Sequence, residues 1–588
     1  MIFVVIAGVV AYQAARDSHV SETQVNIACA ALKSREPGLY AGDGVFGGGG
    51  LWQFHTPMFQ SVLELSLVPT GYEDPTLPFR ILAGMTVLLF LVGMYLLIFR
   101  QTGSWKVAVF VAVLSMTVTH MLGGAFWGVG PLKTITPPTI FQAMTPLIVL
   151  AYLHYERRWQ IVLVFAFIGL MGNMHLVTAM NLTLILLMTY LARQRLTASA
   201  WPVAAACGIT SLTFAVPYVL YYVGVRHQLN VLGGPSDPAV IVQAFQAGKM
   251  ALLYPALLRN LLDWDMTIRV LVLGVIAAMV LLRLERFRVR DRSFWAYMIA
   301  SCVVVALGFQ GLSQLVGHLR GESPPVVDFL RASAMVMLPL YVLLAQGLVN
   351  LSRLWRAHRR LLGWTLALMA AAWILPSDNF MPARRYLYAL AGSVMKEQVQ
   401  PTRFVALQEQ AQRHRELRAI AHWARGGVIA DDPADALATH ETAATGPTTQ
   451  PDVDVPPEPS SPEGSPLFLT DQAEFRLHSR RAILAAPEDV RFMYYLTPGR
   501  LDEWVRRYAQ QQRLLSGAAD NAELTEFFVH LSLQRDLSVV TEYYVVLDAS
   551  RAVEKYPALE PVKSARWGKH WKLYRVTGHA RDEGEAVP

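Results

Sequence analysis

Residues 78–99 read PFRILAGMTVLLFLVGMYLLIF, in which Arg80 is the single charged residue. A helix of about 20 apolar residues is long enough to cross the hydrocarbon core of a bilayer. Similar runs recur along the chain, so hydrophobic residues make up 53% of its 588 residues and charged residues only 16%. The sequence therefore predicts an integral membrane protein, a mainly α-helical transmembrane bundle, rather than a soluble domain.

Eleven apolar runs are predicted to span the membrane. The first is short, and it is a complete short span, a signal-like segment or a span cut by a misplaced start codon. Clusters of Arg and Lys occupy every second connection, which predicts a multi-pass inner-membrane protein with a cytoplasmic N-terminus and a periplasmic C-terminal region. The runs are 2–15, 78–99, 105–123, 137–155, 159–173, 175–192, 201–225, 266–284, 294–316, 327–351 and 361–376.

The regions outside the membrane are predicted from their composition. Within the membrane domain, 1–376, we expect a long outer loop at 16–77 and an amphipathic interfacial helix at about 240–262. Residues 431–466 are rich in Pro, Ser, Thr, Asp and Glu, which predicts a disordered linker. Periodicity predicts a helical segment at 377–430, including a helix at 404–424, and a small α/β domain at 467–577 before a tail at 578–588. In that domain we expect strands at 467–469, 482–485, 543–547 and 571–576, and an amphipathic helix at 501–515.

The composition argues against a nucleic-acid partner and against sites built from cysteine. The net charge of +7 sits largely in the Arg clusters between apolar runs, where topology accounts for it, so no nucleic-acid partner is expected. The three cysteines, Cys29, Cys207 and Cys302, have no metal-binding spacing, and neither a zinc site nor a disulfide framework is expected.

The long outer loop carries the first set of candidate site residues. His19, Glu22 and Asp43 supply one possible base and two carboxylates near the membrane surface, which suits activation of a hydroxyl group. They are also consistent with solvated loop charges. The segment Tyr40-Ala-Gly-Asp-Gly44 is either a ligand-wrapping loop or a turn, and it lacks the Gly-Lys-Ser/Thr of a phosphate-binding P-loop.

A second set of candidates lies at the outer ends of the predicted spans. Arg331 could hold a lipid phosphate by charge-assisted hydrogen bonds, or it could pair with Asp328 three residues earlier. His175 is either a ligand or a helix-end residue. Lys133 and Arg320 would add positive charge to the same face.

The chain resembles the C-type (GT-C) polyprenyl-phosphate-dependent glycosyltransferases, and more narrowly a bacterial family of uncharacterised polytopic membrane proteins related to them. The closer resemblance rests on four features at separate places in the sequence. They are Pro37-Gly-Leu-Tyr-Ala-Gly-Asp43, His175, Phe475-Arg-Leu-His-Ser-Arg-Arg-Ala-Ile483 and Glu503-Trp-Val-Arg-Arg507.

The resemblance implies a catalytic carboxylate soon after the first span, matched here by Asp17 or Glu22. Metal-dependent members place acidic residues in the second outer loop, but residues 124–138 contain no Asp or Glu. Hard divalent cations need several oxygen ligands, so we expect metal-independent chemistry without a cofactor.

Two functions remain open on the sequence. The first is transfer of a sugar from a polyprenyl-phosphate donor to an envelope acceptor on the outer face, with Asp17 or Glu22 as base, Asp43 as an orienting carboxylate, and Arg331 with Lys133 or Arg320 as phosphate clamp. His19 and His175 would line the same site. The second is a non-enzymatic envelope assembly partner or, less favoured, a transporter, because polar groups such as Gln142, Asn181 and Gln310 are sparse within the spans.

Overall fold

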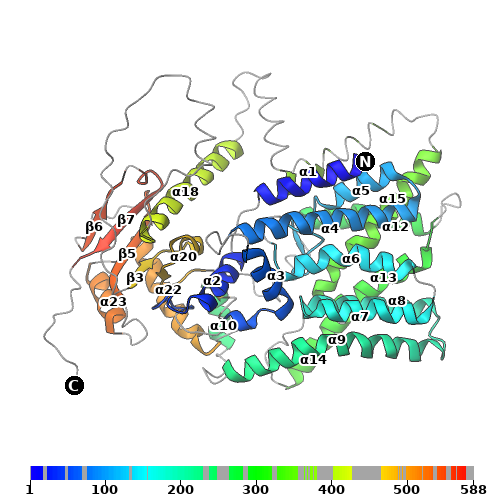
Figure 1. Cartoon of the computed structure of the whole chain (residues 1–588), viewed down its shortest axis with the longest axis horizontal. Helices are drawn as coiled ribbons and strands as arrows, with labels where there is room; N and C mark the ends of the chain where they lie inside the picture. Colours follow the sequence, from blue (N-terminus) through cyan, green and yellow to red (C-terminus); the bar gives the residue numbers. More distant parts are fainter. Residues whose placement is uncertain are drawn as a thin grey trace. The chain divides into compact units, whose positions relative to one another are not determined.

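The computed structural model contains two compact units, and each is described by itself (Figure 1). The helical unit comprises Met1–Gln24, His55–His227 and Ala251–Val394, and the mixed unit comprises Val25–Phe54, Gln228–Met250 and Met395–Pro588. The structure describes residues 2–17, 23–46, 51–68, 76–131, 135–154, 157–229, 238–247, 264–282, 289–320, 328–354, 363, 367, 371, 373–374, 377–380, 402–426, 465–487, 489–490, 493, 498–519, 521–533, 540–550, 556, 558–564 and 566–577.

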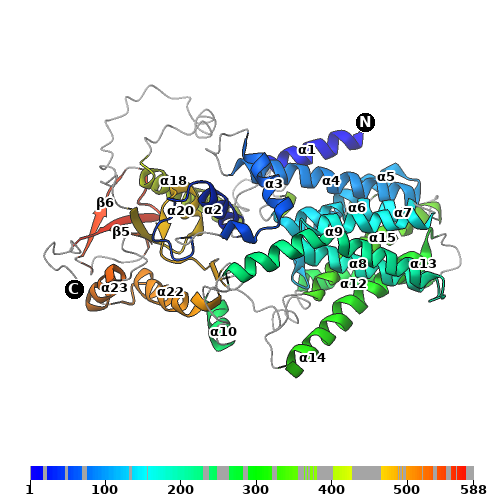
Figure 2. The ribbon, with the colours of Figure 1, turned by 60° about the horizontal axis from the view of Figure 1, so that its bottom comes forward.

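Apolar helices make up the helical unit (Figure 2). Their bounds are α1 (Ile2–Asp17), α3 (Pro57–Leu67), α4 (Leu77–Thr102), α5 (Trp105–Ser115), α6 (Pro137–His154), α7 (Arg158–Gly172), α8 (Leu176–Arg193), α9 (Ala200–Leu229), α12 (Trp264–Leu282), α13 (Arg292–Val303), the π-helical η5 (Val304–Phe309), α14 (Gln310–Arg320), the 3₁₀ helix η6 (Phe329–Val336) and α15 (Met337–Leu354).

Five of these helical stretches are long and apolar enough to cross a bilayer: Leu77–Thr102, Leu176–Arg193, Ala200–Val225, Arg292–Val316 and Phe329–Arg353. Phe3–Arg16, Trp105–Ser115, Arg158–Gly172 and Ile268–Leu282 are shorter apolar helices. The protein is therefore a membrane protein, as predicted, while the count of eleven spans is not confirmed. Most of the eleventh predicted span, 361–376, lies outside the described residues.

Burial separates the central helices from the peripheral ones. Within the stretch Phe329–Arg353, 78% of an 18-residue apolar window is buried within the protein, whereas the corresponding share within Ala200–Val225 is 22%. The exposed residues of α9 include large apolar side chains such as Ile209, Leu212 and Leu220. Such a surface would be costly in water but suits contact with lipid, because the bilayer core is as apolar as these side chains.

Basic and aromatic residues gather at one end of the helical unit. Arg100 at the end of α4 donates to Leu153 O of α6 at 2.5 Å, and Arg290 donates to Arg100 O at 2.9 Å. Gln346 of α15 donates to Gln101 Oε1 at 3.0 Å. Indole rings are exposed at the first turns of α5, α7 and α9, and interfacial Trp is typical of a membrane surface. These rings belong to Trp105, Trp159 and Trp201.

At the opposite end of the helical unit, side-chain hydrogen bonds to backbone carbonyls join segments that are distant in the sequence. Thr56 donates to Met174 O at 2.7 Å, and Asn379 donates to Met116 O at 2.9 Å and Gly130 O at 2.8 Å. The end of α15 therefore lies near the basic end of the helical unit, and Asn379 lies at the other end.

A five-stranded sheet organises the mixed unit, in the order β4-β3-β5-β7-β6. Strand β3 runs parallel to β4 and β5, and β7 runs antiparallel to β5 and β6. The strands are β3 (Ser465–Leu469), β4 (Ala482–Ile483), β5 (Val540–Asp548), β6 (Leu559–Val562) and β7 (Trp571–Val576). The helices are α2 (Thr23–Arg35), α10 (Pro238–Ala247), α18 (Thr402–Ala424), α20 (Ala473–Ser479), α22 (Leu501–Leu515) and α23 (Asn521–Leu533), with the short 3₁₀ turn η1 (Leu51–Phe54).

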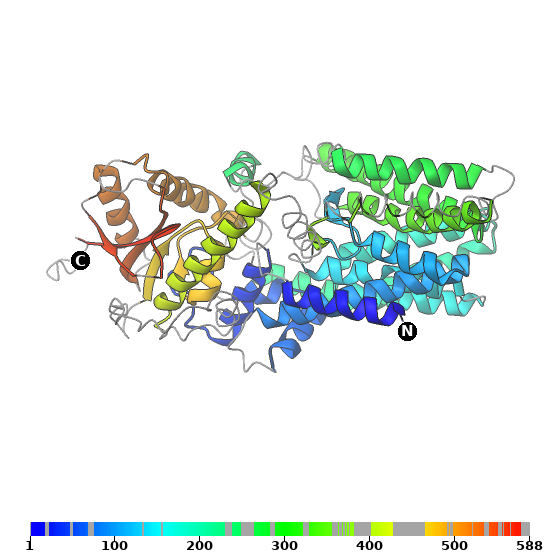
Figure 3. The ribbon, with the colours of Figure 1, turned by 90° about the horizontal axis from the view of Figure 1, so that it is seen from above.

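The two faces of the sheet are covered by different helices, because successive strand residues point to opposite faces. Leu467 and Val545 pack in one core with residues of α22 and α23 such as Leu514 and Phe528. On the other face, Phe468 packs on α20, and Tyr544 packs edge-on against Trp423 of α18. Figure 3 shows α18 crossing one face of the sheet with α22 and α23 on the other. The result is three layers, α/β/α.

Most of the predicted elements of this unit are confirmed, although the strand expected at 482–485 is only Ala482–Ile483, and the extent of the unit was not predicted. The strands at 467–469, 543–547 and 571–576 and the helix at 501–515 form as expected. The linker predicted at 431–466 ends two residues earlier than expected, because Ser465 and Pro466 belong to β3. Its other residues, 431–464, lie outside the described residues. The helix expected at 240–262 is described over Pro238–Ala247, where it packs on α22. Both this helix and Val25–Phe54 group with the C-terminal residues.

Candidate functional site

The 3₁₀ helix η6 interrupts the regular helical structure of the helical unit. Asn181 of α8 donates to Asp328 O at 3.1 Å, and Gln310 at the start of α14 accepts from Phe329 N at 2.9 Å. Irregular backbone at membrane depth needs partners of this kind, because lipid offers none. Two of the polar residues predicted within the spans therefore fix the start of η6.

A glycine hairpin packs against the same segment. Strands β1 (Met121–Leu122) and β2 (Ala125–Phe126) pair antiparallel across Gly123 and Gly124, whose φ angles are +61° and +76°. A Cβ on Gly123 would lie 2.1 Å from Ser333 Oγ and 2.3 Å from Leu330 O, so only glycine allows this approach. The hairpin, which has no acidic residue, thus contributes a support for η6.

Arg331 projects from η6 and pairs with Asp328, as one of the two sequence readings predicted. Its Nε lies 3.0 Å from Asp328 Oδ2, and the two side chains are 23% and 15% exposed. The terminal guanidinium nitrogens of Arg331 have no hydrogen-bond partner among the described residues. A partly exposed guanidinium with unused donors can bind an anionic oxygen.

His175 lies near Arg331 but serves as a helix cap. It directly precedes α8, and its Nδ1 accepts from Thr178 N at 3.2 Å. Burial and the positive charge of Arg331 lower the pKa of His175 to about 3. The ring is therefore neutral at physiological pH and adds no charge to the site.

Arg269 of α12 was missed by the sequence analysis. The residue is 9% exposed, and its Nη1 donates to Thr117 O at 3.1 Å and to Thr117 Oγ1 at 3.0 Å. Its guanidinium carbon lies 5.9 Å from the ring centroid of Trp373. These partners are uncharged. The available signal was its place in the apolar run 266–284, since a charged residue in a span is costly and marks a functional candidate.

The other predicted site residues are placed only in part. Asp17 ends α1 and Arg320 ends α14, and nothing is described of either side chain. His19, Glu22 and Lys133 lie outside the described residues.

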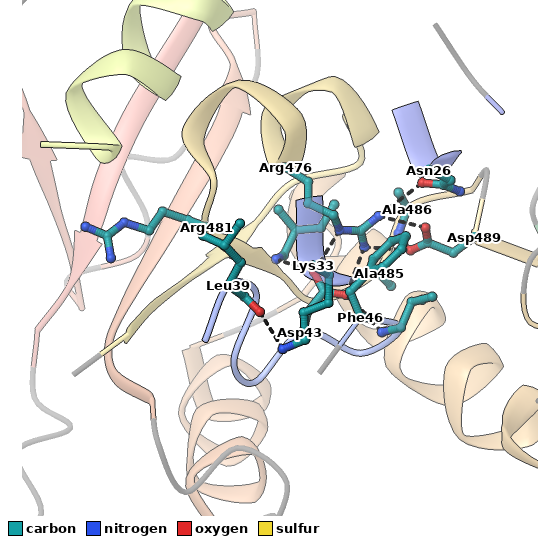
Figure 4. A network of polar contacts seen from close by, with 12 residues as sticks. Asn26, Lys33, Leu39, Asp43, Phe46, Arg476, Arg481, Ala485, Ala486 and Asp489 are labelled. Carbon is teal, nitrogen blue, oxygen red and sulfur yellow. Dashed lines mark hydrogen bonds and ion pairs between the residues drawn. The ribbon is translucent and has the colours of Figure 1, made fainter. Parts of the chain in front are cut away.

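Asp43 lies in the mixed unit, inside a fully buried ion cluster (Figure 4). Arg476 of α20 donates from Nε to Asp43 Oδ2 at 2.7 Å and from Nη1 to Asp489 Oδ1 at 2.9 Å. The same Nη1 donates to Asn26 Oδ1 of α2 at 3.3 Å. The three charged side chains have no exposed surface. This cluster joins the first loop to the C-terminal residues.

The oxygens of Asp43 are saturated with donors. Oδ1 accepts from Val45 N and Phe46 N, both at 2.9 Å, and from Arg476 Nη2 at 3.2 Å. Oδ2 accepts from Arg476 Nε and from Ile483 N at 3.0 Å. Although burial lowers it, the pKa of Arg476 is raised well above its usual value by Asp43 and Asp489. A carboxylate held in this way is suited to positioning the backbone and poorly placed to accept a proton.

The turn around Asp43 packs closely on the C-terminal residues. Tyr40 and Gly42 have φ angles of +55° and +77°, and Asp43 N donates to Tyr40 O at 3.0 Å. A Cβ on Gly44 would lie 2.5 Å from Leu484 O and 3.7 Å from Arg507 Nη1. Three of the motifs that carry the family resemblance therefore meet in one place.

The fold and these sites define a helical membrane protein that carries a mixed α/β unit. No protein-family model matches the sequence, and no curated protein matches it. Among solved structures, the chain is similar to the Archaeoglobus fulgidus oligosaccharyltransferase in its apo form, with a TM-score of 0.44 and 14% identity over 93% of this chain and 69% of that one.

The chain is also similar to two further Archaeoglobus fulgidus oligosaccharyltransferase structures, again over 93% of this chain and 69% of each of those chains. The oligosaccharyltransferase tethered with an acceptor peptide has a TM-score of 0.38 and 12% identity, and AglB in complex with an inhibitory peptide and a dolichol-phosphate has 0.39 and 13%. All three TM-scores are below 0.5.

Proposed function

We propose that the protein is a membrane glycosyltransferase that moves a sugar from a polyprenyl-phosphate donor to an acceptor at the periplasmic face. The observation that carries this proposal is Arg331, whose terminal guanidinium nitrogens are unused, on a 3₁₀ segment held by Asn181, Gln310 and the glycine hairpin. A preorganised cation of this kind stabilises the negative charge that develops on a departing phosphate.

Arg269 is the second cation of this proposed site. It is buried beside the start of the second outer loop with neutral partners, and it would contribute charge where the lipid phosphate leaves the bilayer. Lys133 and Arg320 remain candidates for the same clamp. His175 would support the site as a neutral cap of α8, and His19 remains a candidate for contact with the sugar.

Asp17 or Glu22 is the proposed general base for the acceptor hydroxyl. Asp43, which the sequence predicted as an orienting carboxylate, is poorly placed to contact the acceptor directly, because five donors occupy its oxygens. Its contribution would be to hold the first loop. The proposed reaction uses no metal, since residues 124–138 supply no carboxylate.

The composition of the mixed unit supports the proposed topology. Asn26 and Asp43 contact C-terminal residues, and α10 packs on α22, so three distant chain segments must share one compartment. An even number of crossings must then separate them. The predicted spans give six between the first two segments and four between the second and third. This agrees with an inner-membrane protein whose N-terminus is cytoplasmic and whose C-terminal unit is periplasmic.

Transfer can be tested with the full-length protein in lipid nanodiscs and a radiolabelled polyprenyl-phosphate sugar. We expect Arg331→Gln and Arg269→Gln to lower the rate about 100-fold each, the size of effect typical for one lost charge-stabilising donor. Arg290→Gln, at the opposite end of the helical unit, is the matched control and should retain the wild-type rate. Wild-type rates for both Asp17→Asn and Glu22→Gln would refute the proposed base.

An envelope assembly partner is the second candidate function. The ion cluster around Arg476 favours it, because it makes the first loop part of the mixed unit rather than a free catalytic loop. This role predicts that the mixed unit captures an envelope component while Arg331→Gln has no effect on that capture. Transport is less favoured, because Asn181 and Gln310 are used to hold η6 and do not mark a path.

A further inference from the structure

The mixed unit contains a polar pocket where its strand order reverses. The chain passes from β3 to its neighbour β4 on one side and then returns to β5 on the other side of β3. In open α/β sheets, ligands bind outside the carboxyl ends of the strands at such a switch point. Asp471 follows the carboxyl end of β3, and Asp548 ends β5.

A pocket of about 80 Å³ occupies this position. Its polar lining consists of Arg413, Asp471, Gln472, Asp548 and Trp571. A buried water needs roughly 10–15 Å³ by this kind of measure, so the pocket offers room for several waters. It could accept one small ring but not a nucleotide or a peptide segment.

The walls of the pocket are fixed by hydrogen bonds outside it. Glu416 of α18 accepts from His570 N at 2.8 Å and from Trp571 N at 3.2 Å. Trp571 Nε1 donates to Arg413 O at 3.1 Å, and the Arg413 guanidinium lies 5.3 Å from the centroid of that ring. A pocket with rigid walls loses little conformational entropy when a ligand binds.

The charges of the pocket disfavour an anionic ligand. Arg413 forms an ion pair with Asp548, whose Oδ1 also accepts from Ser550 N at 3.0 Å. Although partial burial raises it, the pKa of Asp548 is lowered by the bonds from Ser550 and the charge of Arg413. The one cation of the lining is therefore neutralised.

Asp471 is the remaining charged residue of the pocket lining that can contact a ligand. Its Oδ1 accepts from Gln472 Nε2 at 2.7 Å, and Oδ2 has no donor among the described residues. No group of three or more His, Cys, Asp or Glu in the described part of the chain could hold a metal ion. A carboxylate oxygen beside an amide and a guanidinium matches a ligand that donates and accepts through hydroxyl groups.

We infer that this pocket binds one neutral hydroxylated ring, a single monosaccharide unit, with Asp471 accepting hydrogen bonds from its hydroxyl groups and Gln472 and Arg413 beside it. This inference goes beyond the proposed transfer reaction, because a sugar-binding pocket would serve an assembly partner equally well. It concerns only the mixed unit.

Saturation-transfer NMR on the full-length protein in detergent tests the inference with a panel of neutral monosaccharides and glucosamine. At least one neutral sugar should give a signal that saturates with concentration. Asp471→Asn and Gln472→Ala should each weaken its binding at least tenfold. Asp502→Asn is the matched control, because this carboxylate is exposed on α22, and it should leave binding unchanged.

Three results would overturn the inference: no neutral sugar binds the wild type, binding persists in both pocket variants, or glucosamine alone binds. Circular dichroism of the variants checks that they fold. Because binding is measured without turnover, a protein that binds sugar but does not transfer it would refute the proposed function and leave this inference intact.

Discussion

Asp43 and Arg476 are 433 positions apart in the sequence, and their side chains are joined by an ion pair of 2.7 Å with no exposed surface. Asp489 completes the cluster, so one guanidinium binds two carboxylates, while Asn26 Oδ1 accepts from the guanidinium and the backbone N–H of Ile483 donates to Asp43. A buried charge is tolerated only with partners of this kind, and the loss of Asp43 would leave Arg476 Nε and the N–H of Ile483 without this acceptor.

Asp43→Asn should destabilise the mixed unit by about 3–5 kcal/mol, the cost typical of breaking one side of a buried ion pair. Chemical unfolding of the full-length protein measures this change in stability. The readout is the proteolytic cleavage of the mixed unit as it unfolds. Glu36→Gln is the matched control, because Glu36 pairs with Arg480 at the surface and 48% of its side chain is exposed. Equal stability of the Asp43 and Glu36 variants would show that the cluster does not hold the first loop.

Gly44→Ala should also detach the first loop, by about 1–3 kcal/mol, the usual cost of overpacking. The added methyl would lie 2.5 Å from Leu484 O, and a backbone oxygen cannot move aside as a flexible side chain can. Gly38→Ala is the control, since nothing lies within 4 Å of its Cβ position. Comparison of the two variants in the same unfolding assay separates this contact from a general effect of losing glycine.

Gly123→Ala should lower sugar transfer, because the methyl would displace Leu330 and Ser333 and with them Arg331. Gly103→Ala provides a matched backbone control. Gly103 has φ +67°, close to the +61° of Gly123, but nothing lies within 4 Å of its Cβ position. If both variants lose the same activity, the loss is explained by strain at the positive φ angle. In that case the hairpin does not act by supporting η6.

Cys29 offers a probe of the ion cluster. Burial raises the pKa of its thiol to about 12, an effect only partly offset by Arg476. In the Cys207→Ala/Cys302→Ala background, maleimide labelling of Cys29 at pH 8 should therefore be slow in the native protein and fast after unfolding. Asp43→Asn should accelerate labelling at least tenfold by promoting local opening. Rapid labelling of the native protein would contradict the burial of this thiol.

The same thiol predicts a loss of stability in alkaline solution. A thiol in the unfolded chain ionises near its ordinary pKa of 9.0, whereas in the folded unit it stays protonated until about pH 12. The unfolded state therefore binds fewer protons between these values, and stability falls as the pH rises through them. Cys29→Ala should reduce this decline in a pH series of unfolding measurements.

Local periodicity was sufficient to predict many of the elements. The run 78–99 became α4, the amphipathic pattern at 501–515 became α22, and the apolar strand at 543–547 lies within β5. Each signal depends on residues a few positions apart, so it can be read without knowing the fold. The Asp328–Arg331 pair was predictable for the same reason, since three residues separate its members.

The tertiary structure alone decided what Asp43 and Arg269 contact. Asp43 had the appearance of an exposed loop carboxylate, yet its partner Arg476 lies in a motif 433 residues away. Arg269 stood in an apolar run, and its partner Thr117 is 152 positions distant. Such contacts depend on how the chain closes on itself, and no local pattern encodes them. The sequence by itself therefore determined a helical membrane protein with an α/β unit, and only the tertiary structure showed that the first loop belongs to that unit.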